Sequence, residues 1–147
     1  MKKIMMTLAL ALTLSTMYAF TGEEAINKQA LHAFKTEFIG ATDIAWTVSG
    51  DYYKVTFTMS EQKLFAYYDK SGEFMGATRY ISSFQLPLNL QSSLKKSYGN
   101  YWISDLFELA NHDGTGYYVT LETADVKIIL KSTDGSNWSL FEKIQKA

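Results

Sequence analysis

Residues that could carry acid–base or metal chemistry are few and widely spaced in this chain of 147 residues, which has two histidines and no cysteine. His32 falls inside a predicted helix, where a partly exposed histidine is ordinary. His112 lies in the segment 111–114, whose single His and single Asp fall short of the three or four ligands that zinc takes from a protein. Asp113-Gly114 is better explained as a turn. The sequence therefore predicts neither a metal site nor a cofactor.

Three pairs of acidic residues are candidates for catalytic carboxylates: Glu23-Glu24, Asp105 with Glu108, and Glu122 with Asp125. A working pair must converge and have pKa values that are pushed apart. The first pair stands at a predicted helix start, where acids interact well with the helix dipole, and the others fall at strand ends or turns. No Gly-x-Ser-x-Gly elbow and no phosphate-binding glycine loop occurs. We therefore expect a protein that is not an enzyme.

The elements that would position these residues occur twice in the same order, at about 23–81 and again at about 87–144. Alternating residues of one strand recur at a constant offset of 64, in the pairs Tyr53/Tyr117, Val55/Val119 and Phe57/Leu121. Upstream, 43–48 aligns with 104–109. Chance similarity between two β-rich segments is the alternative, but agreement in both order and spacing indicates a duplicated supersecondary unit.

Hydrophobic periodicity predicts one helix at the start of each copy. The first has apolar residues at helical spacing, and Thr21 with Glu24 at capping-box spacing places its start near Thr21. The second begins at Pro87. The stretches that follow alternate apolar and polar residues between short turns, which predicts antiparallel neighbouring strands; they are 44–48, 52–59, 63–68 and 73–81, then 102–110, 117–123, 126–132 and 137–144.

These elements predict an α+β fold. Two tandem α-β-β-β-β repeats would form one curved antiparallel sheet with both helices on one face. We expect a single domain over 20–147, preceded by a leader. Because the only proline is Pro87, both sets of strands are free to pair as central strands.

Residues 1–19 have the pattern of a secretory signal peptide, with Lys2-Lys3, an apolar run at 4–14 and a small residue at the end. A membrane anchor is the alternative, but the run is shorter than the ~20 residues that a spanning helix needs. Without a cysteine there is no lipid anchor of the bacterial lipoprotein type. We expect a periplasmic or secreted protein that is not stably inserted in a membrane after cleavage.

The charge balance is mild, since removal of the leader takes two of 14 basic residues and leaves 12 against 15 acidic ones, a net charge of −3. A nucleic-acid surface would need clustered Lys and Arg, and Arg79 is the only arginine. We therefore expect no nucleic-acid partner.

A candidate binding surface emerges from the alternation of the strands. If Tyr53, Val55 and Phe57 face the helices, the opposite face is polar but carries aromatic rings. The residues predicted on it are Tyr52, Lys54, Phe65, Tyr67, Tyr118, Thr120 and Ile129. Tyrosine-rich faces suit protein recognition. Ordinary cross-strand packing explains the same residues equally well.

The organisation resembles the PepSY-like family, also described as β-lactamase-inhibitor-like. The residues that carry the resemblance are 44–46, 53–57 and 65–73, which recur more weakly at 116–121 and 134–135. The resemblance covers nearly the whole mature chain. It implies a small exported protein of tandem helix-plus-sheet units without catalytic residues. The β-lactamase inhibitory protein to which the family is likened binds an enzyme through its sheet face, but it uses disulfides and this chain has none.

Two functions of different classes follow. The first is a non-catalytic exported binding protein, an inhibitor or modulator of another envelope or secreted protein or peptide, acting through its open sheet face. The alternative is a small-molecule or peptide carrier with a cleft between helices and sheet. A pocket of ~300 Å3 or more, lined from both copies, would favour the carrier.

Overall fold

The computed structural model describes residues 22–147, so the predicted leader at 1–19 and Thr21 lie outside the described residues. The same order of elements occurs twice within this range. The first copy consists of η1 (Glu23–Ala25), α1 (Lys28–Glu37), β1 (Thr42–Val48), β2 (Tyr52–Met59), β3 (Gln62–Asp69) and β4 (Phe74–Tyr80). The second consists of η2 (Ser83–Gln85), α2 (Leu88–Ser97), β5 (Trp102–Asn111), β6 (Gly114–Glu122), β7 (Val126–Ser132) and β8 (Ser139–Gln145).

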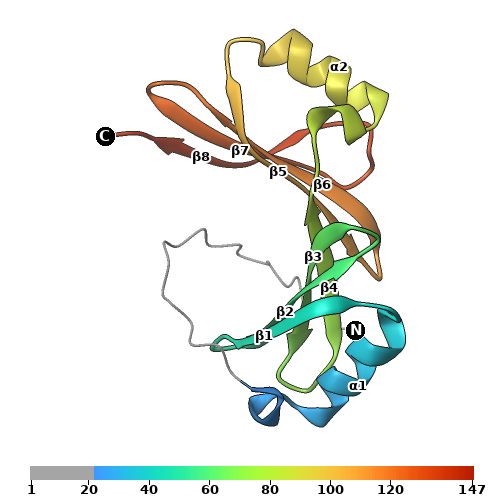
Figure 1. Cartoon of the computed structure of the whole chain (residues 1–147). Coiled ribbons are helices and arrows are strands. Elements are labelled where there is room, and N and C mark those ends of the chain that lie inside the picture. The colour runs from blue at the N-terminus through green and yellow to red at the C-terminus, as the bar shows by residue number, and fades with distance from the viewer. Residues whose placement is uncertain (1–21) are drawn as a thin grey trace, which may run out of the picture.

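The eight strands form one antiparallel sheet in which each strand pairs with its neighbours along the chain, from β1 at one edge to β8 at the other. Figure 1 shows α1 and α2 on the same, outer side of the bent sheet. The face without helices is therefore concave. The predicted α+β fold, with two helices and one curved antiparallel sheet that does not close, is confirmed.

The first helix begins later than its sequence signal suggests, whereas the second begins directly after the predicted Pro87. The predicted start near Thr21 is wrong, because the chain first makes the short 3-10 turn η1 and α1 begins at Lys28. Asn27 caps α1, and its side-chain oxygen accepts a hydrogen bond of 2.7 Å from the backbone N–H of Gln29. In the second copy Pro87 precedes α2, where its missing N–H costs nothing.

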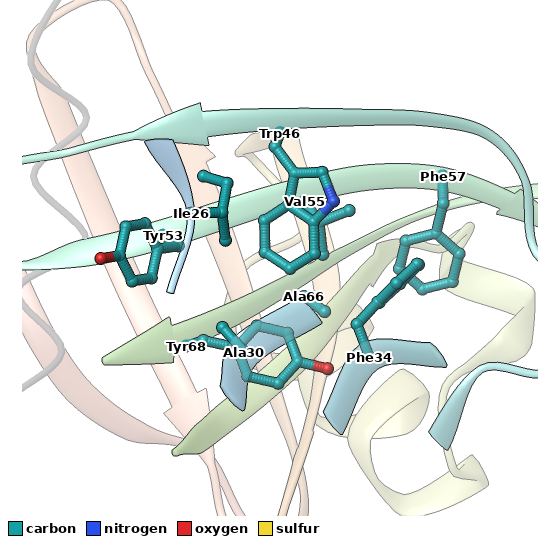
Figure 2. Close-up of a cluster of buried hydrophobic side chains, with 9 residues drawn as sticks. All are labelled: Ile26, Ala30, Phe34, Trp46, Tyr53, Val55, Phe57, Ala66 and Tyr68. Atoms are coloured by element: carbon teal, nitrogen blue, oxygen red, sulfur yellow. The ribbon is translucent and has the colours of Figure 1, made fainter. Parts of the chain in front are cut away.

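Each helix covers its own half of the sheet, and the buried side chains form two clusters that share no residue. In the first cluster α1 places Ala30 and Phe34 against rings of the strands (Figure 2). Phe34 meets Trp46 and Phe57 edge-on, with ring centroids 5.5 and 5.0 Å apart. In the second cluster the corresponding side chains are aliphatic; its buried members are Ile81, Leu86, Leu90, Leu94, Leu106, Val119, Leu121, Ile128 and Leu130.

The two clusters correct the predicted alignment of 43–48 with 104–109 by one residue. Trp46 is buried in the first cluster and Leu106 in the second. Their offset of 60 is also that of the buried helix positions, Ala30 with Leu90 and Phe34 with Leu94. Phe107, which the sequence alignment put in the place of Trp46, is one residue further on and therefore faces the concave side.

The two halves join where β4 pairs with β5, in a register that runs from Ala77 opposite Ala110 to Tyr80 opposite Phe107. On the helix side of this seam the guanidinium of Arg79 donates two hydrogen bonds of 3.2 Å to the carboxylate of Glu108. A third, of 2.8 Å, goes to the side-chain oxygen of Gln62 in β3. The seam is thus fixed by a backbone ladder and by a bidentate ion pair.

The turn between β3 and β4 packs directly on α1. Gly72 has φ +93°, and a Cβ placed there would lie 2.7 Å from the backbone nitrogen of Ala30 and 2.7 Å from the Cβ of Gln29. The corresponding Gly135 in the second copy has φ +70°, but its Cβ would meet only the Cγ of Pro87, at 3.6 Å. Glycine suits both positions because φ is positive there, and at Gly72 it is also needed because a Cβ would clash with α1.

We predict that Gly72→Ala lowers the free energy of unfolding by roughly 2–4 kcal/mol, because it adds a backbone clash to left-handed strain. Gly135→Ala is the matched control and should cost roughly 1–2 kcal/mol, for the strain alone. Urea denaturation of both variants measures the difference. Equal losses would show that the turn is free to move away from α1.

Candidate binding surface

A row of aromatic rings crosses the concave face from the first copy to the second. Tyr52 meets Tyr67, and Phe65 meets Tyr80, both edge-on with ring centroids 5.8 Å apart. Across the seam Tyr80 lies opposite Phe107. Phe107 stacks on Tyr118 at 5.1 Å with the rings nearly parallel, and Tyr118 meets Phe141 of β8 edge-on at 5.8 Å. We call these seven residues the aromatic row.

The structure places all seven predicted site residues on the face without helices. Residues that pair directly across two strands share a face, and the pairs here join the predicted residues to others of that face. Tyr67 lies opposite Lys54, Phe65 opposite Thr56, and Thr120 opposite Ile129. Four of them are partly exposed: Tyr52, Lys54, Phe65 and Tyr118.

Three of the seven are on the predicted face but largely covered. Tyr67, Thr120 and Ile129 keep only 8 %, 4 % and 9 % of their surface. Alternation assigns a side chain to a face but says nothing of the curvature, and a concave face brings neighbouring side chains together over its middle. The ammonium of Lys54, for example, reaches to 6.0 Å from the ring centre of Tyr67. These three therefore support the surface rather than form it.

The predicted site residues do not include three members of the aromatic row, Tyr80, Phe107 and Phe141, or the acid Asp105 that lies beside the row. Tyr80 is the most exposed ring of the row, with 66 % of its surface accessible. Phe107 was missed because of the one-residue misalignment, and Phe141 because β8 was not assigned a face. The offset of 60 between the two helices, carried forward to Trp46 and Leu106, would have placed Phe107 correctly.

A shallow hollow of about 50 Å3 lies on the concave face at the seam, lined by Lys54, Phe65, Tyr67, Thr78, Arg79, Tyr80, Asp105 and Phe107. Its size suits a single side-chain head group rather than a whole ligand. The hollow brings Lys54 and Asp105 together between aromatic rings. Within residues 22–147 neither Lys54 nor Asp105 has an oppositely charged side chain within 4.0 Å.

The two charged residues are held in environments that oppose their ionisation. Burial lowers the pKa of Lys54, and repulsion from the ammonium of Lys63 lowers it further. Burial raises the pKa of Asp105, although a backbone hydrogen bond at Leu106 and the charge of Lys127 act in the opposite direction. Lys54 also lies over the ring of Phe65, 4.7 Å from its centre. The surface thus carries desolvated charges that a partner could compensate.

Asp105 and Glu108, one of the candidate acidic pairs, lie on opposite faces of the sheet. Glu108 pairs with Arg79 on the helix side of the sheet, whereas Asp105 faces the concave side. The carboxylate of Glu122 binds the ammonium of Lys146 at 2.6 Å. His112 is exposed and lies edge-on to the ring of Phe74 at 5.7 Å. In residues 22–147 no group of three or more His, Cys, Asp or Glu side chains is placed to hold a metal.

A second hollow, of about 220 Å3, lies between α2 and the sheet on the opposite side of the molecule from the aromatic row. Its walls come from the second copy alone, with Leu94 and Tyr98 of α2 opposite Ile103 and Leu121 of the sheet. In size and in lining it falls short of the pocket that the carrier hypothesis required.

Solved structures with the same fold are similar to this chain. A BLIP-like protein from Bacteroides fragilis is 22 % identical with a TM-score of 0.70, over 82 % of this chain and 86 % of that one. A DUF2874 family protein from Bacteroides ovatus is 15 % identical with a TM-score of 0.72, over 82 % and 87 %. A protein from Bacteroides eggerthii, described as a candidate periplasmic protein, is 13 % identical with a TM-score of 0.69, over 82 % and 88 %.

No family model matches the sequence, and no curated protein matches it. The structural neighbours agree with the BLIP-like part of the predicted resemblance, and the PepSY-like assignment stays a prediction. At these identities the likeness establishes the fold alone. No helix in residues 22–147 combines the length and the apolar composition needed to cross a membrane.

The raised pKa of Asp105 has a consequence for stability. Below its ordinary value of 3.8 the acid is protonated in both folded and unfolded chains and contributes nothing. As the pH rises from 3.8 to the higher pKa of the folded state, the unfolded chain ionises first and the free energy of unfolding falls; above the folded-state pKa the loss is complete. We predict that Asp105→Asn is more stable than the wild type at pH 7 and equal to it near pH 3. Urea denaturation at the two pH values checks this, and a destabilised variant at pH 7 would contradict it.

Proposed function

We propose that this protein is a non-catalytic exported binding protein that captures another protein of the cell envelope on its concave sheet face. The observation that carries the proposal is the aromatic row, which runs across both copies on a face that neither helix of residues 22–147 covers. Aromatic side chains supply much of the binding energy of protein interfaces, because they bury a large area at a small cost in conformational entropy.

Cross-strand packing explains part of the row, but not all of it. Tyr67 and Phe107 are buried and stabilise the sheet whether or not a partner binds. Tyr80 meets Phe65 edge-on and leaves 66 % of its surface in water. A large exposed ring flanked by desolvated charges has no structural benefit that a smaller polar residue would not provide. Tyr80 is therefore the centre of the proposed contact.

The charges beside Tyr80 indicate how a partner would be oriented. Lys54 and Lys63 lie on the first-copy side of the hollow and repel each other, whereas Asp105 lies on the second-copy side. A partner with an acidic group over the lysines and a basic group over Asp105 would relieve both unfavourable environments. Such complementarity contributes specificity and association rate more than affinity.

Two further points support a role in the envelope. The leader predicted at 1–19 is typical of export, and one structural neighbour is described as a candidate periplasmic protein. The name of another neighbour, BLIP-like, fits a binding or inhibitory role. An inhibitor or modulator of an envelope or secreted protein is the form of the proposal that these points favour.

We predict that Tyr80→Ala combined with Tyr118→Ala weakens partner capture at least tenfold. Replacing either tyrosine at the centre of the contact should cost about 1 kcal/mol or more of binding free energy. Pull-down from the native envelope fraction with purified protein identifies the partner, and titration of that partner with both forms measures the change. Circular dichroism confirms that the variant is folded.

The matched control is Phe84→Ala, which removes an equally large exposed ring from the helix side, where 84 % of Phe84 is accessible. This variant should capture the partner as the wild type does. Capture that survives the tyrosine substitutions but is lost with Phe84→Ala would move the interface to the helix side and reject the concave face.

A further inference from the structure

The place in the first copy that corresponds to the hollow beside α2 is occupied by aromatic rings, although the same elements surround both places. In the first copy three rings fill it: Phe34 and Phe38 from the helix and its end, and Phe57 from β2. They meet pairwise, with ring centroids between 4.7 and 5.5 Å apart. The first copy therefore has a closed aromatic core where the second has a hollow of about 220 Å3.

Substitutions at equivalent positions explain the difference. Leu94 stands in the place of Phe34, and Leu121 in the place of Phe57. Tyr98, in the place of Phe38, meets the ring of Tyr101 at 5.5 Å instead of contacting a ring on the sheet. The second copy thus lacks two of three rings, and an apolar cavity of ~150 Å3 already holds one benzene ring.

The walls of the hollow are held in place. The side-chain amide of Gln91 donates hydrogen bonds of 2.8 Å to the carbonyl of Leu86 and 3.3 Å to that of Phe84. These bonds tie η2, which carries the exposed Phe84, to α2. Leu94 and Leu121 keep only 7 % and 1 % of their surface, so the floor of the hollow is apolar and belongs to the buried core of the second copy.

The charge at the rim of the hollow indicates which charged group a bound aromatic ligand would have. Lys95 is the only charged residue that lines the hollow, and no acid lines it. Lys95 has no acidic side chain within 4.0 Å among residues 22–147. Lys96 follows it in the last turn of α2, and together the two ammonium groups outweigh the partial negative charge of the helix end.

We propose that this hollow is a binding site for a small aromatic carboxylate, with the ring over Leu94 and Leu121 and the carboxylate toward Lys95. The site is independent of the concave face, and the proposal does not rest on the proposed function. The ligand is a free small molecule, because the hollow has room for one ring and a short polar tail and opens at a single charged residue.

The test uses three probes: 3-phenylpropionate, its neutral analogue 3-phenylpropanamide, and propionate, which has no ring. Amide shifts in nitrogen–proton NMR spectra of the whole protein locate and measure binding. For 3-phenylpropionate we expect a Kd on the order of 1 mM, as is usual for so small a ligand, with shifts at residues 94–103 and at Leu121. The amide should bind several-fold more weakly, and propionate should not bind.

Variants separate the ring from the charge. Leu121→Phe restores the ring that Phe57 supplies in the first copy and should weaken binding of 3-phenylpropionate at least tenfold. Leu94→Phe, which restores the ring of Phe34, serves the same purpose if Leu121→Phe does not fold. Lys95→Met should abolish the preference for the acid over the amide, and Lys96→Met is the matched control that should keep it.

Three results would overturn the proposal: no shifts with 3-phenylpropionate at tens of millimolar, shifts confined to the concave face, or unchanged affinity in the filled variant. An equal affinity for acid and amide in the wild type would reject the role of Lys95. Loss of partner capture in the variants of Tyr80 and Tyr118 has no bearing on these results, so the two proposals fail separately.

Discussion

The pairing of β4 with β5 is the constraint on which the rest of the structure depends. Each copy has its own helix and its own buried cluster, and the clusters share no residue. A backbone ladder of four residue pairs, with the side chains beside it, fixes one half against the other. The same seam positions Arg79 and Glu108 on the helix side, and Tyr80 and Phe107 on the concave side. The aromatic row is continuous only because this register holds, so the stability of the seam and the shape of the surface cannot vary independently.

The two copies share the same pattern of buried positions, but the side chains at those positions differ in volume. The burial of residues 23–40 matches that of 83–100 almost position by position, and yet rings fill the first cluster where branched aliphatic side chains fill the second. A smaller side chain in a duplicated frame leaves space unless the backbone closes over it. Closure is limited here because both helices are tied to the same sheet. The hollow beside α2 is thus a physical consequence of unequal filling, and no change of fold is needed to produce it.

The sequence predicts the fold well because its signals are local. Alternation in β2 and β3 assigns Tyr53, Val55 and Phe57 to the helices, and short turns make the strands antiparallel neighbours. What it could not predict depends on irregularity or curvature. The offset between the copies is 60 from the helices to Trp46 and Leu106 and 64 further on, so the alignment of 43–48 with 104–109 put Phe107 in the place of Trp46. The bend of the sheet buries Thr120 and Ile129 on a face that alternation alone calls exposed.

The edges of the sheet bear on which surface is available for docking. An open sheet offers two unpaired strands, and strand addition there is an alternative way to bind a peptide. Here β1 carries a register shift between Thr42 and Ala45, with Asp43 at φ +52°, and β8 places Glu142 and Lys143 at the middle of its exposed length. Bulges and charges of this kind oppose edge pairing. The concave face has no such protection: burial of Asp105 costs stability when that acid is ionised, and the most exposed ring of the face, Tyr80, stays in water. Under the proposed function, edges that resist pairing favour docking of the partner on the concave face over addition of a strand.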